Sequence, residues 1–144
     1  MHQPDMAPNV GAAIRLAACL GIAVDLLEPF GFVYHPAKLR RIALDYLGHA
    51  AIRRHASFRE FEAWRRTQGR RLVLLTTEAP CANTEAAYRA DDVLMVGAEG
   101  SGVPREVHEA ADLRVGIPMR PGLRSLNVVT AAAMVLGEAL RQQR

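Results

Sequence analysis

Residues 92–104, DVLMVGAEGSGVP, join a short apolar run to a glycine-rich loop that ends in proline. The run 92–97 predicts a strand, and Pro104 suits the first turn of a following helix, where its missing N–H costs no hydrogen bond. Ligand-binding loops of α/β sheets lie between a strand and a helix in this way. Three glycines within six residues allow a flat ligand to approach closely. The stretch therefore predicts a ligand-binding loop, with a glycine-rich turn without a ligand as the alternative.

The same loop argues against a dinucleotide ligand. Glu99 stands where a G-x-G-x-x-G motif needs its second glycine. A carboxylate at this place would repel a pyrophosphate. The loop therefore favours a neutral or cationic nucleoside, and a nicotinamide-dependent oxidoreductase is disfavoured.

Short apolar runs alternate with segments of helical periodicity along the whole chain. This alternation predicts an α/β fold with a mostly parallel sheet flanked by helices. The expected strands are residues 23–27, 72–76, 92–97 and 113–118, with a weaker candidate at 51–54. The expected helices are residues 10–20, 37–42, 58–68, 105–111 and 126–142. No internal repeat or linker interrupts residues 1–144, so we expect one domain.

Two further segments place polar residues at the start of a predicted helix. Residues 8–15, PNVGAAIR, contain Asn9, a candidate helix cap, and Arg15. Both side chains stand near the helix start, where they could bind one anionic group together. Residues 117–127, IPMRPGLRSLN, lead from a strand into the last helix, with Ser125 as its candidate cap. That helix is apolar on nearly every face, which indicates burial on all sides or an oligomer interface. Each segment alone also fits an ordinary capped helix.

The net charge of +3 is unevenly distributed. Residues 38–71 hold ten basic and three acidic residues, whereas residues 72–112 hold two basic and eight acidic ones. Seventeen of the eighteen basic residues are arginine, which binds phosphate through two parallel hydrogen bonds and stacks on bases. The block 38–71 therefore indicates an anionic partner such as RNA, or alternatively a solvated arginine-rich surface.

Composition excludes several other classes of protein. Half of the residues are hydrophobic and 23% are charged, which is not typical of a disordered chain. The longest charge-free apolar run, 126–137, is too short to cross a membrane, and the first residues lack a secretory signal pattern. Cys19 and Cys81 lie far apart, which favours a reducing cytoplasm. The five histidines show no metal-ligand spacing, so no metal is expected.

In this order and spacing, the three segments resemble motifs 1 to 3 of the SPOUT RNA methyltransferases. Motif 1 is similar to residues 9–15, N-x-G-x-x-x-R, and motif 2 to residues 97–104, G-x-E-x-x-G-V-P. Motif 3 is similar to residues 117–119, IPM, followed by residues 124–127, RSLN, with Glu138 later in the last helix. Further stretches resemble the branch of TrmL-like tRNA wobble-nucleotide 2′-O-methyltransferases, namely residues 27–32, 39–46 and 75–77.

The resemblance implies a fold, an activity and partners. It implies a parallel sheet with a deep C-terminal trefoil knot, S-adenosylmethionine (SAM) as cofactor and S-adenosylhomocysteine as product. It also implies tRNA as substrate, with methylation of the wobble cytidine or uridine 34, and a homodimer with each active site near the interface. Methylation of another tRNA or rRNA ribose stays an alternative, as does a SAM- and RNA-binding module without catalysis.

The resemblance also implies roles for individual residues. The expected cofactor-binding residues are Leu75, Thr76, Gly97, Glu99, Gly102, Ile117, Met119, Ser125 and Leu126. The expected catalytic residues are Asn9, Arg15, Ser125 and Asn127. The candidate contacts to the tRNA backbone are Arg40, Arg41, Arg53 and Arg54.

In this assignment Arg15 holds the phosphate beside the target ribose and stabilises the developing alkoxide. A guanidinium with a pKa above about 12 is a poor base at neutral pH. Asn9 is expected to orient Arg15, while Ser125 and Asn127 place the ribose. Members of the family open with a complete strand, but only three residues precede Pro4 here, so we expect the first strand to be short or lost.

Overall fold

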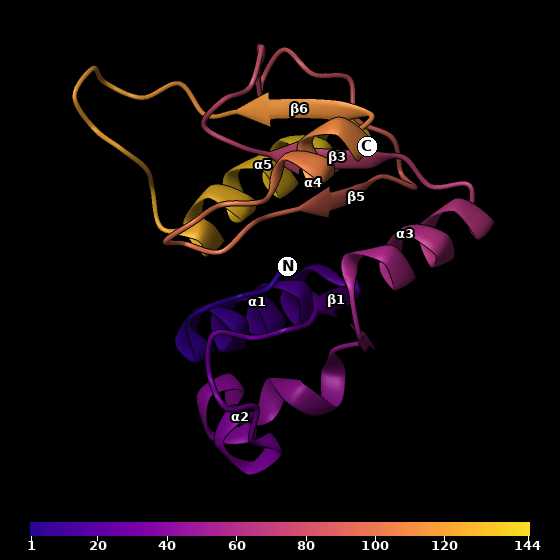
Figure 1. Cartoon of the computed structure of the whole chain (residues 1–144), viewed down its shortest axis with the longest axis vertical. Coiled ribbons are helices and arrows are strands. Elements are labelled where there is room, and N and C mark those ends of the chain that lie inside the picture. Colours follow the sequence, from indigo (N-terminus) through magenta and orange to yellow (C-terminus); the bar gives the residue numbers. More distant parts are fainter.

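The computed structural model describes residues 1–144, apart from the side chain of Asp45, which belongs to one of the stretches that carry the resemblance. Helices and strands alternate along most of the chain, as the apolar runs predict (Figure 1). The helices are α1 (Ala7–Leu20), α2 (Pro36–Ala43), the 3₁₀ helix η1 (Leu44–His49), α3 (Phe58–Thr67), α4 (Arg105–Ala110) and α5 (Val128–Gln142). The strands are β1 (Val24–Leu27), β2 (Ile52–His55), β3 (Leu72–Leu75), β4 (Cys81–Ala82), β5 (Val93–Met95) and β6 (Leu113–Gly116).

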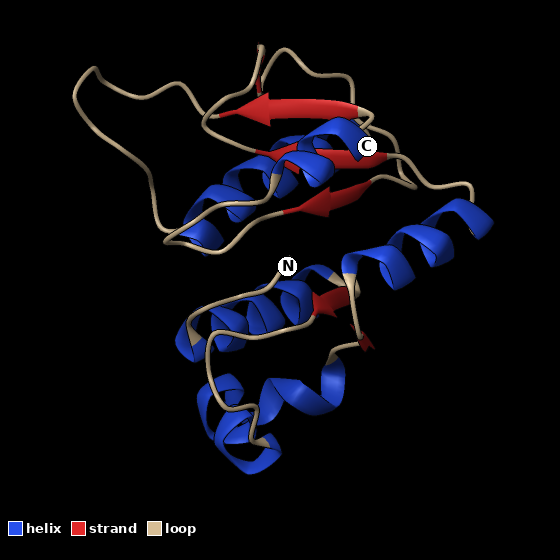
Figure 2. Cartoon of the chain, in the orientation of Figure 1, coloured by secondary structure: helices blue, strands red, loops and turns tan.

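The strands form two parallel sheets (Figure 2). One pairs β1 with β2, and the other has the order β4-β6-β3-β5. β3 lies inside the larger sheet, which explains why its sequence, LVLL, is apolar on both faces. The predicted α/β fold with a mostly parallel sheet is confirmed, and the trefoil knot stays a prediction of the resemblance.

Helices cover both faces of the larger sheet. Leu72 and Leu74 of β3 share one buried cluster with Val107 of α4. Val73 belongs to another cluster with Val135 of α5. Successive side chains of a strand point to opposite faces, so α4 and α5 lie on opposite sides of β3. A third cluster joins α1, α2 and β1. The helices pack on the faces of the larger sheet, so the carboxyl ends of its strands lead into loops.

Residues 1–3 lie between the two sheets. The N–H of His2 donates to the carbonyl oxygen of Val96, just after β5, at 2.8 Å. The N–H of Gln3 donates to the carbonyl oxygen of Leu27 in β1 at 3.0 Å, and His2 pairs with Leu27 in parallel. The segment expected as a short first strand therefore connects β1 to the edge of the larger sheet.

Two helix caps differ from expectation. α1 begins at Ala7, and its N-cap residue Met6 makes no side-chain hydrogen bond, so Asn9 lies inside the first turn and does not cap the helix. A proline in that first turn allows the earlier start. α5 is capped by Asn127 rather than by Ser125. Asn9 and Ser125 are thereby free for other contacts.

Candidate active site

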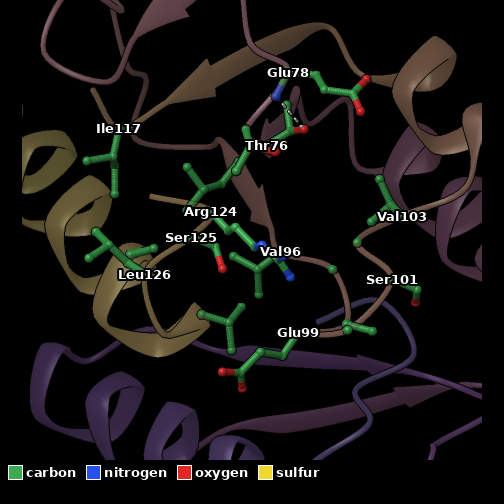
Figure 3. A pocket seen from close by; sticks show the side chains of 18 of the residues that line it. Thr76, Glu78, Val96, Glu99, Ser101, Val103, Ile117, Arg124, Ser125 and Leu126 are labelled. Atoms are coloured by element: carbon green, nitrogen blue, oxygen red, sulfur yellow. Dashed lines mark hydrogen bonds between the residues drawn. The ribbon is translucent and has the colours of Figure 1, made fainter. Parts of the chain in front are cut away.

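A cavity of about 500 Å³ opens at the carboxyl ends of β3, β5 and β6 (Figure 3). These strands are parallel and end at the same edge of the sheet, where open α/β sheets bind their ligands. The three loops after the strands supply lining residues from 76–78, 96–103 and 117–126. The volume falls within the range of small-molecule sites.

The cavity brings the predicted cofactor-binding residues together. All nine line it, namely Leu75, Thr76, Gly97, Glu99, Gly102, Ile117, Met119, Ser125 and Leu126. Three charged or titratable lining residues had no site role in the sequence analysis: Arg124, which lies in motif 3, and Glu78 and His108, which lie outside the motifs. The backbone N–H of Glu78 donates to Oγ1 of Thr76 at 3.2 Å, so this residue could have been found from its place in the same loop. His108 depends on the orientation of α4, which no short motif indicates.

The glycine loop is closed by its own backbone. The N–H of Ala98 donates to the carbonyl oxygen of Gly102 at 3.0 Å, and the N–H of Gly102 donates back to Ala98 at 2.9 Å. A Cβ added to Gly97 would lie 2.4 Å from the carbonyl carbon of Gly102. Position 97 therefore requires glycine, because backbone fills the space a side chain would need.

A chain of polar side chains connects the glycine loop to the starts of α1 and α5. Asn127 Nδ2 donates to Asn9 Oδ1 at 3.0 Å, and Asn9 Nδ2 donates in turn to the Glu99 carboxylate. Asn127 Oδ1 accepts the N–H groups of Val129 and Thr130, and so caps α5. The Asn9 amide is fixed in one orientation, because only that orientation satisfies both neighbours. Side chains from all three predicted segments thus form one network.

Arg15 lies apart from this network. Its guanidinium carbon sits over the ring of Tyr46 in η1, 5.2 Å from the ring centroid, and the residue is exposed. Arg15 is not among the described residues that line the cavity. Six positions along an α-helix turn two side chains about 120° apart, so Asn9 and Arg15 face different sides. The expectation that Asn9 orients Arg15 and that both address one anion is corrected: Asn9 binds Glu99 and Asn127 instead.

The four candidate RNA-binding arginines fall into two kinds. Arg40 and Arg41 are exposed on α2, beside a shallow depression formed with η1. Arg53 lies 3.5 Å from Asp25 and stacks on the ring of Trp64, with its guanidinium carbon 4.1 Å from the centroid. Arg54, also on β2, forms an ion pair with the carboxylate of Glu28. The two arginines on β2 are therefore partly engaged within the protein, whereas those on α2 face solvent.

A histidine site, a metal site and a membrane-spanning helix would each require particular features among the described residues. The buried ring of His55 lies with Nε2 2.7 Å from Asp25 Oδ1 and packs against Phe61 and Trp64, which is a structural role. In the part of the chain that the structure describes, no group of three or more His, Cys, Asp or Glu side chains could hold a metal ion. Among the described helices, none combines the length and apolar character needed to cross a membrane.

Comparison with known protein families agrees with this geometry. Residues 1–137 match the model of the SpoU rRNA methylase family. The chain belongs to the SpoU family. The resemblance to SPOUT methyltransferases is thereby confirmed, and the cavity at the ends of β3, β5 and β6 is the candidate active site of a SpoU-family chain.

Individual relatives of this SpoU-family chain are similar over nearly its whole length. It is 52% identical to the tRNA (cytidine(34)-2′-O)-methyltransferase of Ancylobacter novellus, over 99% of this chain and 90% of that protein. A solved structure concerning the 2-OH methylation of C/U34 on tRNA is 35% identical, with a TM-score of 0.92, and covers 99% of this chain and 92% of that one. The SpoU methyltransferase AviRb from Streptomyces viridochromogenes, solved in complex with AdoMet, is 29% identical with a TM-score of 0.88; the match covers 99% of this chain and 58% of AviRb.

Proposed function

We propose that this SpoU-family chain transfers a methyl group from SAM to the ribose 2′-hydroxyl of nucleotide 34 of tRNA, a cytidine or uridine. The observation that carries the proposal is one cavity lined by all nine expected cofactor-binding residues and tied to α1 and α5 by the Asn127–Asn9–Glu99 network. The 52% identity to a tRNA (cytidine(34)-2′-O)-methyltransferase supports the substrate, and the AdoMet-bound neighbour supports the cofactor. Because its substrate is tRNA, we place the enzyme in the cytoplasm.

The cavity fits SAM in size and charge. Its volume of about 500 Å³ suits a nucleoside-sized ligand. The apolar side chains of Leu75, Ile117 and Leu126 offer contacts to a flat adenine ring. The carboxylates of Glu78 and Glu99 suit the positive sulfonium and ammonium groups, whereas they would repel a pyrophosphate.

The chain contributes alignment and charge to the reaction. When bound, SAM supplies a methyl group on a positively charged sulfur, and S-adenosylhomocysteine is the product. Alignment of the reacting atoms alone can supply roughly 7–11 kcal/mol. Ser125 lines the cavity, where its hydroxyl would contact the target ribose, while Asn127 holds the start of α5 against Asn9. Arg15 lies outside the cavity, and its proposed role is to bind the phosphate beside the target ribose.

The direct test is methyl transfer to a defined ribose. The purified protein is incubated with labelled SAM and either a tRNA or the same tRNA with a 2′-deoxynucleotide at position 34. We expect label only in the first, because the second lacks the accepting hydroxyl. Equal labelling of both would indicate another position of the tRNA. In a parallel incubation with rRNA, label in the rRNA alone would indicate an rRNA enzyme. SAM binding without transfer to any RNA would indicate a module without catalysis.

Replacing Arg15 with lysine is expected to reduce kcat by about 100-fold, because an ammonium group cannot make the two parallel hydrogen bonds of a guanidinium to phosphate. SAM affinity is expected to stay within about twofold, since Arg15 does not line the described cavity. Arg105→Lys, at a side chain that is 90% exposed on α4, is the matched control. Near-normal turnover of Arg15→Lys would remove Arg15 from the reaction.

Neutralising the basic face of α2 should weaken tRNA binding. In the Arg40→Gln/Arg41→Gln variant, we expect the slope of log Kd against log salt to fall by about one to two units, because each phosphate contact releases counterions. The Arg59→Gln/Arg66→Gln variant on α3 changes the net charge equally and serves as control. An equal change of slope in both variants would mean that overall charge, and not the face of α2, binds the tRNA.

The homodimer is also part of the proposal. Val135 is the buried residue of α5, and Met134 is 46% exposed, so α5 is not buried on all sides. A groove of about 420 Å³ is lined by apolar residues of α1 and α5 together with residues of β1, β5 and their neighbouring segments. A second copy of the chain would cover this groove. Sedimentation should give a mass of about twice 15.8 kDa, and a monomer at micromolar concentration would contradict the dimer.

A further inference from the structure

Asp5 lies in the turn before α1, and its carboxylate accepts hydrogen bonds from the backbone of the glycine loop. Asp5 Oδ1 accepts the N–H of Glu99 at 3.0 Å, and Oδ2 accepts the N–H of Gly100 at 3.0 Å. These partners are 94 and 95 positions away in the sequence. Asp5 lies outside the three motif segments, so neither the motifs nor the proposed function gives it a role.

Close packing fixes the place of Asp5. The N–H of Gly31 donates to the carbonyl oxygen of Pro4 at 3.0 Å, and a Cβ on Gly31 would lie 2.7 Å from Asp5 Cα. On the other side, a Cβ on Gly100 would lie 3.3 Å from Asp5 Oδ2. Asp5 is therefore held between the loop that follows β1 and the glycine loop. A shift of its backbone would break its contacts to both.

Both oxygens of the carboxylate are bound by the protein itself. Each oxygen accepts one backbone N–H, and Asp5 is not among the described residues that line the cavity. Partial burial raises the pKa of the Asp5 carboxyl group, but the hydrogen bonds from Gly100 and Glu99 outweigh it and leave the pKa below its usual value. The group is therefore ionised at neutral pH and accepts both hydrogen bonds.

Glu99 is consequently held at two points. Its backbone N–H is bound by Asp5, and its side-chain carboxylate is bound by Asn9. Both contacts come from the segment around the start of α1, although the glycine loop itself belongs to the larger sheet. Without Asp5, the N–H groups of Glu99 and Gly100 would lose their protein acceptor, and the side chain of Asn9 would be the remaining hydrogen-bond partner of Glu99 from this segment.

We propose that Asp5 is a positioning residue that holds residues 99–100 of the glycine loop in the conformation that binds SAM. It acts through the loop backbone and does not touch the ligand. The identity of the ligand rests on the proposed function, whereas the hold of Asp5 on the loop can be tested without any ligand.

The test uses Asp5→Asn in the full chain. An asparagine can accept one N–H, but its amide nitrogen then faces the other N–H, so one hydrogen bond is replaced by two opposed donors. We expect the amide protons of Glu99 and Gly100 to exchange with solvent at least about tenfold faster in the ligand-free protein. We expect the Kd for SAM to rise about tenfold, while kcat at saturating SAM and tRNA stays within about twofold.

Glu60→Gln is the matched control. Glu60 Oε2 accepts the N–H of Ala56 at 3.1 Å at the start of α3, so the variant makes the same change from carboxylate to amide beside a backbone N–H away from the cavity. The Kd for SAM should not change in this control. A rise equal to that of Asp5→Asn would show general destabilisation and overturn the proposal.

The two measurements on Asp5→Asn separate the possible failures. Unchanged exchange at Glu99 and Gly100 would overturn the proposal, whatever happens to SAM binding. Faster exchange with an unchanged Kd for SAM would overturn the positioning role as well. If the unaltered protein binds no SAM at all, the proposed function fails, and the exchange rates still decide whether Asp5 holds the loop.

Discussion

Replacing Gly97 with alanine is expected to lower the affinity for SAM by about 100-fold. The added Cβ would lie 2.4 Å from the carbonyl carbon and 2.5 Å from the carbonyl oxygen of Gly102. Both atoms are backbone, and the two hydrogen bonds between Ala98 and Gly102 hold them in place. The loop must therefore open, which removes the wall of the cavity. Calorimetric titration with SAM measures the effect.

Gly137→Ala is the control for the same chemical change. A Cβ on Gly137 meets no atom within 4 Å, and the residue lies inside α5. Alanine has the higher helix propensity by about 1 kcal/mol, so this variant should be slightly more stable and bind SAM normally. Normal SAM affinity in Gly97→Ala would mean that the glycine loop does not form the binding wall.

The Asn9→Asp variant is expected to lose about 1–3 kcal/mol of unfolding free energy at neutral pH. An aspartate has no hydrogen to donate to Glu99, so two carboxylates would face each other where the amide now bonds. A proton shared between them relieves the repulsion, so the folded variant binds more protons than the unfolded chain in mild acid. The stability deficit should therefore shrink as the pH falls from about 8 to about 5. Urea unfolding across this range measures it.

The Asn9→Asp/Glu99→Gln double variant tests the same contact by exchanging donor and acceptor. The glutamine introduced at position 99 can donate through its amide to the aspartate introduced at position 9, which can still accept from Asn127. We expect the double variant to regain most of the lost unfolding free energy, so the two substitutions are strongly non-additive. Additive losses would show that the Asn9–Glu99 hydrogen bond does not contribute to stability.

Local pattern was sufficient to predict most of the fold. The apolar runs marked β3 and β5 because a strand buried on both faces needs no polar residue. The two-residue strand β4 and the short helix η1 could not be predicted, since neither is long enough to show a period. The predicted caps of α1 and α5 were wrong for a different reason. Several polar residues stand near each helix start, and the choice among them depends on distant partners.

The site was predictable only as a set of positions. Residues that follow parallel strands share one edge of the sheet, which is why Leu75, Gly97 and Ile117 meet in one cavity. The contacts that hold the cavity were not predictable. Asn9 meets Glu99 and Asn127 across 90 and 118 positions, and no spacing rule reaches so far. The same limit hid the internal partners of the arginines on β2.

The hydrogen bond between Asn9 and Asn127 spans 118 positions, so it constrains the order in which the protein can be completed. A ribosome makes the start of α1 early and the start of α5 late. While the chain is growing, the amide of Asn9 has no partner on α5, and the wall formed by residues 117–126 does not yet exist. Long-range contacts of this kind form slowly. The binding site is therefore completed only after residues 117–126 have been made, and a shorter nascent chain cannot capture the cofactor.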